Sequence, residues 1–261
     1  MVTRLRWGTA TLVFLSVLCL LPATHAEWSV SALERQPGAN GVVEYRRYSL
    51  GESVAGAETE VHLALFSPRD ATLRVLDQPD FGHRLADAMA RENCLAGVNG
   101  GYFDPQGAPV GLLRSGGKMI APLRRARLLS GVLAVQPGRV QIFRASEFPT
   151  KSAWPEAIQC GPFLVDRGKP VAGLEDTRSA RRTFVLTTSD RRVALGYCAP
   201  LPLARLARVL AALSQLQVTR ALNLDGGSSS AFWCRTEGQT VSLPESKPVR
   251  DFLSIVPLSN R

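Results

Sequence analysis

Histidine is scarce in this sequence, and cysteine is dispersed. The chain has three histidines and five cysteines among 261 residues. Only His62 and His83 lie beyond the first 26 residues, neither is near a cysteine, and no Cys-x-x-Cys pair occurs. Zinc sites in proteins are built from clusters of such ligands. We therefore expect no zinc centre and no resident cofactor.

A hydrophobic run long enough to span a membrane is also lacking. The apolar stretch at residues 12–21 is about half the length that a transmembrane helix needs. It follows Arg4 and Arg6 and precedes Thr24-His25-Ala26, a small-residue cleavage signal. We expect residues 1–26 to be a signal peptide and the mature chain to be periplasmic or secreted, with no stable membrane span. An N-terminal anchor helix is the alternative.

Basic residues exceed acidic ones without forming a long run. The 31 lysines and arginines and 22 aspartates and glutamates give a net charge of +9, and loss of residues 1–26 would leave 29 basic residues and +7. No basic stripe interleaved with aromatics, as in nucleic-acid-binding surfaces, is present. The charge favours an anionic small molecule or glycan phosphate and not nucleic acid. An arginine-rich composition without functional meaning explains it equally well.

Four cysteines remain after residue 26. An even number in an exported chain predicts disulfides, although three connectivities are possible and the sequence does not select one. The cysteines are Cys94, Cys160, Cys198 and Cys234.

The chain contains neither an internal repeat nor a linker that would divide it. We expect residues 27–60 to be an irregular N-terminal extension and residues 61–258 to form one domain. Hairpins outnumber crossovers in the predicted pattern, which indicates an α+β fold with a mixed, mostly antiparallel β-sheet and a few packed helices. The expected hairpins join 61–66 with 72–76, 131–135 with 139–143 and 182–188 with 192–197, and the expected helices cover 80–92 and 202–216.

Two glycine-flanked polar clusters stand out, Asn99–Asp104 and Asn223–Ser230. Each follows a short apolar run and is therefore expected to be the loop at the end of a buried strand. Each contains an asparagine, an aspartate and a Gly-Gly pair, and glycine lets the backbone approach a ligand closely. Although they lie about 120 residues apart, the two loops are predicted to face one pocket.

The second loop carries the stronger candidate for chemistry. Asp225 precedes Gly226, Gly227 and three serines, so its carboxylate could act as a base, a nucleophile or an orienting group. The backbone N–H groups and hydroxyls beside it could bind an anion. An aspartate that caps its own turn is the simpler interpretation. A serine nucleophile is disfavoured, because the Gly-x-Ser-x-Gly elbow is missing.

The first loop is expected to form a wall of the same pocket. Asn99 offers donors and an acceptor, and Gly100 and Gly101 permit close approach. Tyr102 could wall a sugar ring or belong to the core. Asp104 precedes a proline, which predicts extended backbone followed by a turn.

Two further segments add polar groups at the ends of strands. Gln159 precedes Cys160-Gly161-Pro162, and Arg178, Arg181 and Arg182 lie beside the next strand. Arginine binds phosphate or carboxylate with two hydrogen bonds. A solvated basic turn is the alternative for the arginine segment.

Five motifs in this order resemble the phosphodiester glycosidase family, particularly its bacterial exported branch. The resemblance covers about residues 60–257 and implies a hydrolase that cleaves the sugar–phosphate bond of a glycosyl phosphodiester. The motifs are Asn99–Asp104, Pro109–Leu112 with Gly117-Lys118, Gln159–Pro162, Arg181–Thr183 and Asn223–Ser229.

The resemblance implies roles for individual residues. Asp225 is expected to be the catalytic carboxylate, Asp104 a second carboxylate or sugar-hydroxyl ligand, and Arg182 the phosphate ligand, with Arg181 or Arg178 as alternates. A phosphate already leaves well, so one carboxylate and several cationic or N–H donors suffice. The residues expected to bind substrate are Asn99, Gly100, Gly101, Tyr102, Gln159, Arg181, Asn223, Gly226, Gly227, Ser228 and Ser229.

Two other functions stay open from sequence. A non-catalytic module of the cell envelope could use the same loops to bind a glycan or phosphate without cleaving it. A metal-dependent phosphoesterase could use Asn99, Asp104, Asn223 and Asp225 as oxygen ligands. The binding module would leave a phosphodiester intact. The metal-dependent phosphoesterase would lose its activity when the metal is chelated.

Overall fold

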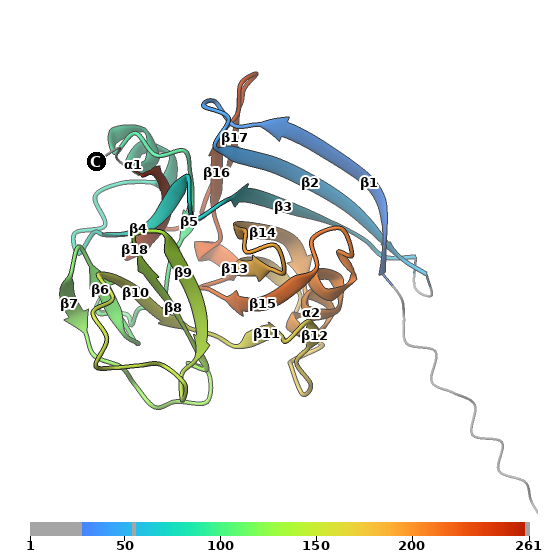
Figure 1. Ribbon diagram of the computed structural model, residues 1–261. Coiled ribbons are helices and arrows are strands. Elements are labelled where there is room, and N and C mark those ends of the chain that lie inside the picture. The colour runs from blue at the N-terminus through green and yellow to red at the C-terminus, as the bar shows by residue number, and fades with distance from the viewer. Residues whose placement is uncertain (1–27, 54–55, 259–261) are drawn as a thin grey trace, which may run out of the picture.

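The computed structural model describes residues 28–53 and 56–258, and its strands form three sheets (Figure 1). Within these residues every strand pairing is antiparallel, which agrees with the mostly antiparallel expectation but includes none of the parallel pairs of a mixed sheet. The largest sheet has eight strands in the order β1 (Trp28–Pro37), β2 (Val43–Glu52), β3 (Glu58–Phe66), β14 (Val193–Leu201), β13 (Ala180–Thr188), β15 (Val218–Asn223), β11 (Phe163–Asp166) and β12 (Lys169–Pro170).

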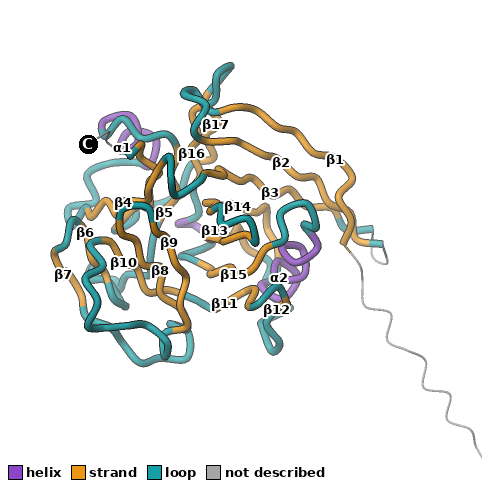
Figure 2. Tube along the Cα trace, in the orientation of Figure 1, coloured by secondary structure: helices purple, strands orange, loops and turns teal. Residues whose placement is uncertain are grey.

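Two five-stranded sheets complete the fold. Figure 2 shows how far strands outweigh helices, so the protein is richer in β-structure than the α+β expectation. The first sheet has the order β7 (Lys118–Ala121), β6 (Leu113–Ser115), β10 (Glu156–Cys160), β8 (Gly131–Gln136) and β9 (Arg139–Arg144), and the second has the order β17 (Thr240–Leu243), β16 (Phe232–Arg235), β5 (Ala96–Asn99), β18 (Asp251–Pro257) and β4 (Ala71–Asp77).

The centre of the eight-stranded sheet is buried on both faces, and β13 shows how the sequence achieves this. Successive side chains of a strand point to opposite faces. Val185 joins the core cluster shared with the two smaller sheets, whereas Phe184 and Leu186 join the cluster on the other side. The strand therefore needs an uninterrupted apolar run. Because β13 and β15 lie inside the sheet, pairing on both sides fixes the positions of their ends.

Helix α2 (Leu203–Ala212) covers one face of the large sheet. Leu206 and Leu210 are fully buried among residues of β2, β3 and β13, as the 3-4-3 leucine spacing predicts. The helix is shorter than the predicted 202–216, and Pro202 is its N-cap with extended backbone. The other described helices are α1 (Leu85–Arg91), also shorter than predicted, and the 3₁₀ helix η1 (Gly227–Ser229).

Two sequence-based expectations about the first half of the chain are wrong. Residues 28–52, expected to be irregular, form β1 and β2, and β1 is a largely exposed edge strand whereas β2 is mostly buried between β1 and β3. β3 and β4 flank the predicted turn at 67–70 but do not form a hairpin, because β3 pairs with β2 and β14 whereas β4 pairs with β18. The other two hairpins are confirmed as β8–β9 and β13–β14.

The expected disulfides are absent from the described residues. Each of the four cysteines is free and buried, and they are spread over three separate core clusters where they act as small apolar side chains.

No helix within residues 28–53 and 56–258 has the length and apolarity to cross a membrane. The predicted signal peptide lies outside the described residues.

Candidate active site

The two glycine loops meet at the junction of two sheets. Asn99 ends β5 in a five-stranded sheet, and Asp225 follows β15 in the eight-stranded sheet. The Asn99 side-chain amide donates to the carbonyl oxygen of Asp225 at 2.8 Å, and the Asp225 N–H donates to the carbonyl oxygen of Gly100 at 3.0 Å. The predicted convergence of these loops is confirmed.

Asn99 acts as a structural hub beneath the site. Its side chain is fully buried, and Oδ1 accepts hydrogen bonds from the Thr183 hydroxyl at 2.7 Å and the Ala231 N–H at 3.0 Å. Together with the bond to Asp225, these contacts connect β5, β13 and the segment after β15. Asn99 therefore fixes the Asp225 loop, and its acceptor is already occupied by protein groups.

Asp225 is only partly buried, and it is held by its neighbours. Its Oδ1 accepts the N–H of Gly226 at 2.9 Å. Burial raises the pKa of Asp225, and three groups oppose the rise: the Ser229 hydroxyl, the Gly226 N–H and Lys247. The Ser229 hydroxyl is near enough to affect this pKa without reaching hydrogen-bond geometry. A desolvated carboxylate of this kind suits a base or nucleophile.

The guanidinium of Arg182 lies beside the Asp225 loop. Its Nε donates to the Leu201 carbonyl at 2.8 Å and its Nη2 to the Arg178 carbonyl at 2.7 Å. Nη1 makes no hydrogen bond with any described residue, and it would be 3.9 Å from a Cβ placed on Gly226. Gly226 thus leaves open the space in front of a fixed cation. Burial lowers the pKa of Arg182, with Glu175 at 3.8 Å opposing the shift.

Arg181 fixes the loop instead of lining it as a free cation. It donates to the carbonyl oxygens of Gly227 at 3.1 Å and Pro244 at 3.2 Å, and to the Ser246 hydroxyl at 2.5 Å. Ser228 is exposed at the tip of the loop. The neighbouring hydroxyls of Ser229 and Ser230 are buried and have no hydrogen-bond partner within the described structure.

Tyr102 and Asn223 join the floor of the site to the segment before β11. The Tyr102 hydroxyl donates to the Gly161 carbonyl at 2.5 Å and accepts from the Asn223 amide at 3.2 Å. The same amide donates to Gly161 at 2.9 Å. Burial raises the pKa of Tyr102, and Cys160 and Asp225 add to the rise. Asn223 thus ties the start of the loop to Gly161 and Tyr102.

Two residues expected to contact substrate have structural contacts instead. Oδ1 of Asp104 accepts the N–H groups of Gln106 at 3.0 Å and Ala108 at 2.8 Å, so the aspartate closes its own turn. The Gln159 amide is buried and fully bonded. It accepts from the N–H groups of Leu112 and Arg124 and donates to the carbonyl oxygens of Arg124 and Leu129.

Sequence reasoning missed Asp251, which supports the first loop from below. This residue begins β18 and is 1% exposed. Its Oδ1 accepts the Gly101 N–H at 2.9 Å, its carbonyl accepts the Gly100 N–H at 2.9 Å, and its Oδ2 has no partner among described residues. Burial raises its pKa to about 7, and Asp225 is among the charges that add to the rise. No motif pointed to Asp251, because it looked like the start of an ordinary strand.

Lys247 is a second residue that the sequence analysis missed. It is exposed, its ammonium lies 5.7 Å from the centre of the Phe103 ring, and it lowers the pKa of Asp225. The site therefore has cations on two elements, Arg182 on β13 and Lys247 before β18. Lys247 lies in a turn near Pro248, where an isolated lysine carries no sequence signal.

The four oxygen donors of the metal-dependent alternative are not free as a set, since Asn99 and Asp104 each use Oδ1 within the protein. Within residues 28–53 and 56–258, no group of three or more histidine, cysteine, aspartate or glutamate residues is placed to hold a metal ion.

Gly100 is predicted to tolerate no side chain. A Cβ at this position would lie 1.8 Å from Asp251 Oδ1, a contact that requires the carboxylate or the loop to move. Gly100→Ala should lower the free energy of unfolding by about 3 kcal/mol, as overpacking does. Gly51→Ala is the control, because a Cβ there meets nothing within 4 Å. Urea unfolding of both variants measures the effect, and equal stabilities would contradict the close packing.

Comparisons with known proteins identify the family of this chain. The family model for phosphodiester glycosidase matches residues 92–256, which contain both glycine loops, Arg182 and Asp251. The chain belongs to the phosphodiester glycosidase family. Membership implies hydrolysis of a glycosyl phosphodiester as the class of reaction. A comparison with curated protein sequences gives no significant match.

Solved structures share the fold of this phosphodiester glycosidase at low sequence identity. The catalytic domain of zebrafish N-acetylglucosamine-1-phosphodiester alpha-N-acetylglucosaminidase, auto-inhibited by its pro-peptide, has a TM-score of 0.63 and 18% identity over 87% of this chain and 88% of that one. A hypothetical protein from Synechocystis gives 0.57 and 16% over 82% and 62%. A putative exported protein from Burkholderia pseudomallei K96243 gives 0.55 and 16% over 77% and 75%.

Proposed function

We propose that this protein is an exported hydrolase that cleaves the sugar–phosphate bond of a glycosyl phosphodiester in the cell envelope. One observation carries the proposal: the Asp225 carboxylate, whose pKa burial raises, belongs to the loop whose next residue, Gly226, packs against the side chain of Arg182. A carboxylate for the sugar and a cation for the phosphate are the two groups that this reaction needs. The family match and the similarity to a putative exported protein support it.

The opposite charges of Arg182 and Asp225 indicate a different role for each. Arg182 Nη1 would bind the phosphate oxygens and stabilise the negative charge that builds up as the bond from the anomeric carbon to the phosphate oxygen breaks. Asp225 would act at the anomeric carbon, either by taking a proton from the attacking water or by attacking directly. The products are a free sugar and a phosphomonoester, and the phosphate needs no general acid to leave.

The proposal is tested with the mature chain and a panel of sugar-1-phosphodiesters. We expect release of reducing sugar and phosphomonoester in equal amounts. NMR of the first-formed anomer separates the two roles of Asp225, because direct attack retains the configuration and water activation inverts it. A panel that stays intact while one of its members binds would overturn the hydrolase and favour the binding-module alternative.

A further inference from the structure

A groove of about 1030 Å³ lies at the end of the large sheet opposite to the candidate active site. It is lined by the β3–β4 turn, the β13–β14 turn, strand β9 and the beginning of β15. Thr219 at its wall and Asp225 are six residues apart along an extended chain, which corresponds to about 20 Å. The groove is therefore separate from the candidate active site.

Positive charge is concentrated in this groove. Five arginines and two carboxylates line it, Glu147 and Asp190, which gives a local excess of +3 out of a whole-chain charge of +9. Such an excess in a concave surface attracts anions. The arginines are Arg69, Arg139, Arg191, Arg192 and Arg220.

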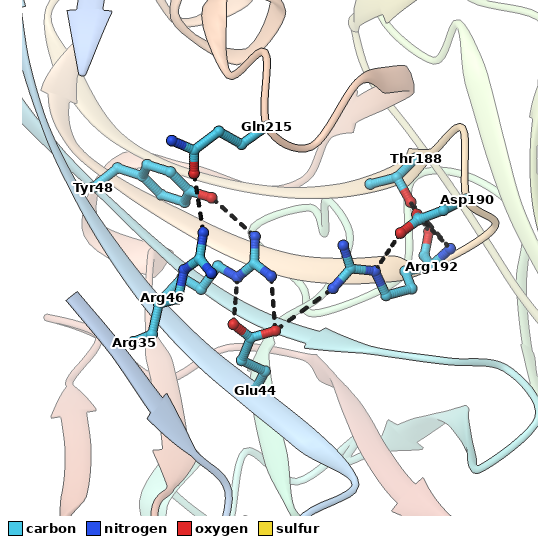
Figure 3. Close-up of polar contacts among 8 residues, drawn as sticks. All are labelled: Arg35, Glu44, Arg46, Tyr48, Thr188, Asp190, Arg192 and Gln215. Atoms are coloured by element: carbon cyan, nitrogen blue, oxygen red, sulfur yellow. Dashed lines mark hydrogen bonds and ion pairs between the residues drawn. The ribbon is translucent and has the colours of Figure 1, made fainter. Parts of the chain in front are cut away.

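Two of these arginines are held rigidly by carboxylates and form part of the wall. Figure 3 shows Arg192 between Asp190, at 2.7 Å, and Glu44, at 3.5 Å, and Glu44 is in turn bound to Arg46. Arg220 is held by Glu147 at 3.1 Å and by the Ile142 carbonyl at 2.7 Å.

The other three arginines have no carboxylate partner among the described residues. Arg69, Arg139 and Arg191 are exposed along the groove. Arg139 lies over the ring of Trp154 at 5.3 Å, which orients its guanidinium. Arg191 has a φ of 66°, a left-handed conformation that is unfavourable for any residue with a Cβ. A turn residue there would ordinarily be glycine or asparagine, so the arginine is kept at a conformational cost.

The neutral lining indicates which anion fits. Ser67, Thr187 and Thr219 line the groove, and the hydroxyls of the two threonines are hydrogen-bonded to each other at 3.0 Å. The buried Oε1 of Gln141 has no partner in the described structure. These groups suit sugar hydroxyls. Bases of single-stranded nucleic acids need exposed aromatic faces. Phe143, the aromatic residue in this lining, is packed against Phe148 and Trp154.

We propose that the groove binds a polyanionic glycan, whose phosphate or carboxylate groups pair with Arg69, Arg139 and Arg191 and whose hydroxyls bond to the threonines and Gln141. Its volume is at the upper end of the range of about 300–1,000 Å³ typical of ligand sites, which accommodates several sugar units. The glycan would be held about 20 Å from Asp225.

The test is a calorimetric titration of the mature chain at fixed ionic strength. The probes are a hexagalacturonate for carboxylate, a mannose-6-phosphate-bearing oligosaccharide for phosphate, and maltohexaose as the neutral sugar. We expect at least one anionic probe to bind, which identifies the anion, and maltohexaose not to bind. Arg69→Glu with Arg191→Glu should weaken this binding about tenfold or more, because two charge-assisted contacts become repulsive.

The matched control is Lys118→Glu with Lys169→Glu, the same change in charge at exposed residues outside the groove. An equal loss in both double variants would show that binding follows net charge alone and would overturn the proposal. The proposal would also be overturned if poly-glutamate or oligo-dT bound more tightly than both anionic glycans. It would be overturned as well if neither anionic glycan bound. Arg69→Gln with Arg191→Gln replaces the first double variant if thermal unfolding shows that it does not fold. The measurement needs no turnover, so its outcome is independent of the proposed hydrolysis.

Discussion

Asp225→Asn is expected to lower kcat about 10²–10⁴-fold on whichever glycosyl phosphodiester the protein hydrolyses, the range typical of removing an acid–base group. Asparagine keeps an oxygen that can accept the Gly226 N–H, which the aspartate binds at 2.9 Å. The loop should therefore keep its conformation while the charge that acts on water or on the sugar is lost. KM should change much less than kcat, because Arg182 still binds the phosphate.

Steady-state kinetics of the variant and of Asp87→Asn check this expectation. Asp87 is exposed on α1, so its substitution controls for the loss of one negative charge. Asp104→Asn adds a second comparison. If it lowers kcat as much as Asp225→Asn does, then Asp104 is a second catalytic carboxylate and not merely the cap of its own turn. Unchanged turnover in Asp225→Asn would remove Asp225 from the mechanism.

Asp251 should make the protein less stable at alkaline than at acidic pH. Its pKa is about 7 in the fold against an ordinary 3.8, so the folded state binds a proton more tightly than the unfolded state. The stabilisation from that proton is complete below about pH 4 and is lost as the pH rises through 7. The difference between the two pKa values corresponds to about 4 kcal/mol in the free energy of unfolding.

Asp251→Asn should remove this pH dependence, because asparagine accepts the Gly101 N–H without acquiring a buried charge. Urea unfolding at pH 5 and pH 8 measures it: the stability of the wild type relative to the variant should fall between these two pH values. Asp251→Ala separates the hydrogen bond from the charge, since it leaves the Gly101 N–H unpaired and should be less stable than Asp251→Asn at both pH values. Equal pH slopes in wild type and Asp251→Asn would contradict the assignment.

The sequence predicts the two strand-end glycine loops and the two main hairpins, because each is encoded locally. The convergence of the loops, which lie about 120 residues apart, is predicted instead from the residue types that they share. An apolar run that ends in Asn and Gly-Gly specifies a buried strand with an open end. Pairing partners are not encoded in the same way. The turn at 67–70 is where it was predicted, yet β3 and β4 enter different sheets because their partners come from distant segments.

The protein contacts made by residues that were predicted to bind substrate have a common physical origin. A buried polar side chain at the end of a strand can face a ligand or satisfy the backbone of its neighbours, and its sequence context is the same in both cases. Gln159 and Asp104 satisfy backbone groups. Asp251 shows the converse, because its importance arises only where the strand that it begins packs beneath Gly100.

The burial of Asn99 also bears on its chemical stability towards deamidation. Asn99 precedes Gly100, and in mobile chains an Asn-Gly pair deamidates when the glycine nitrogen attacks the side-chain amide. Here the Gly100 N–H is bound to the Asp251 carbonyl, and the Asn99 amide is bound at both its nitrogen and its oxygen. The fold therefore keeps the attacking and attacked groups apart. Deamidation would place an acceptor where Asn99 now donates to Asp225, so the bonds that build the site also protect it from this chemical damage.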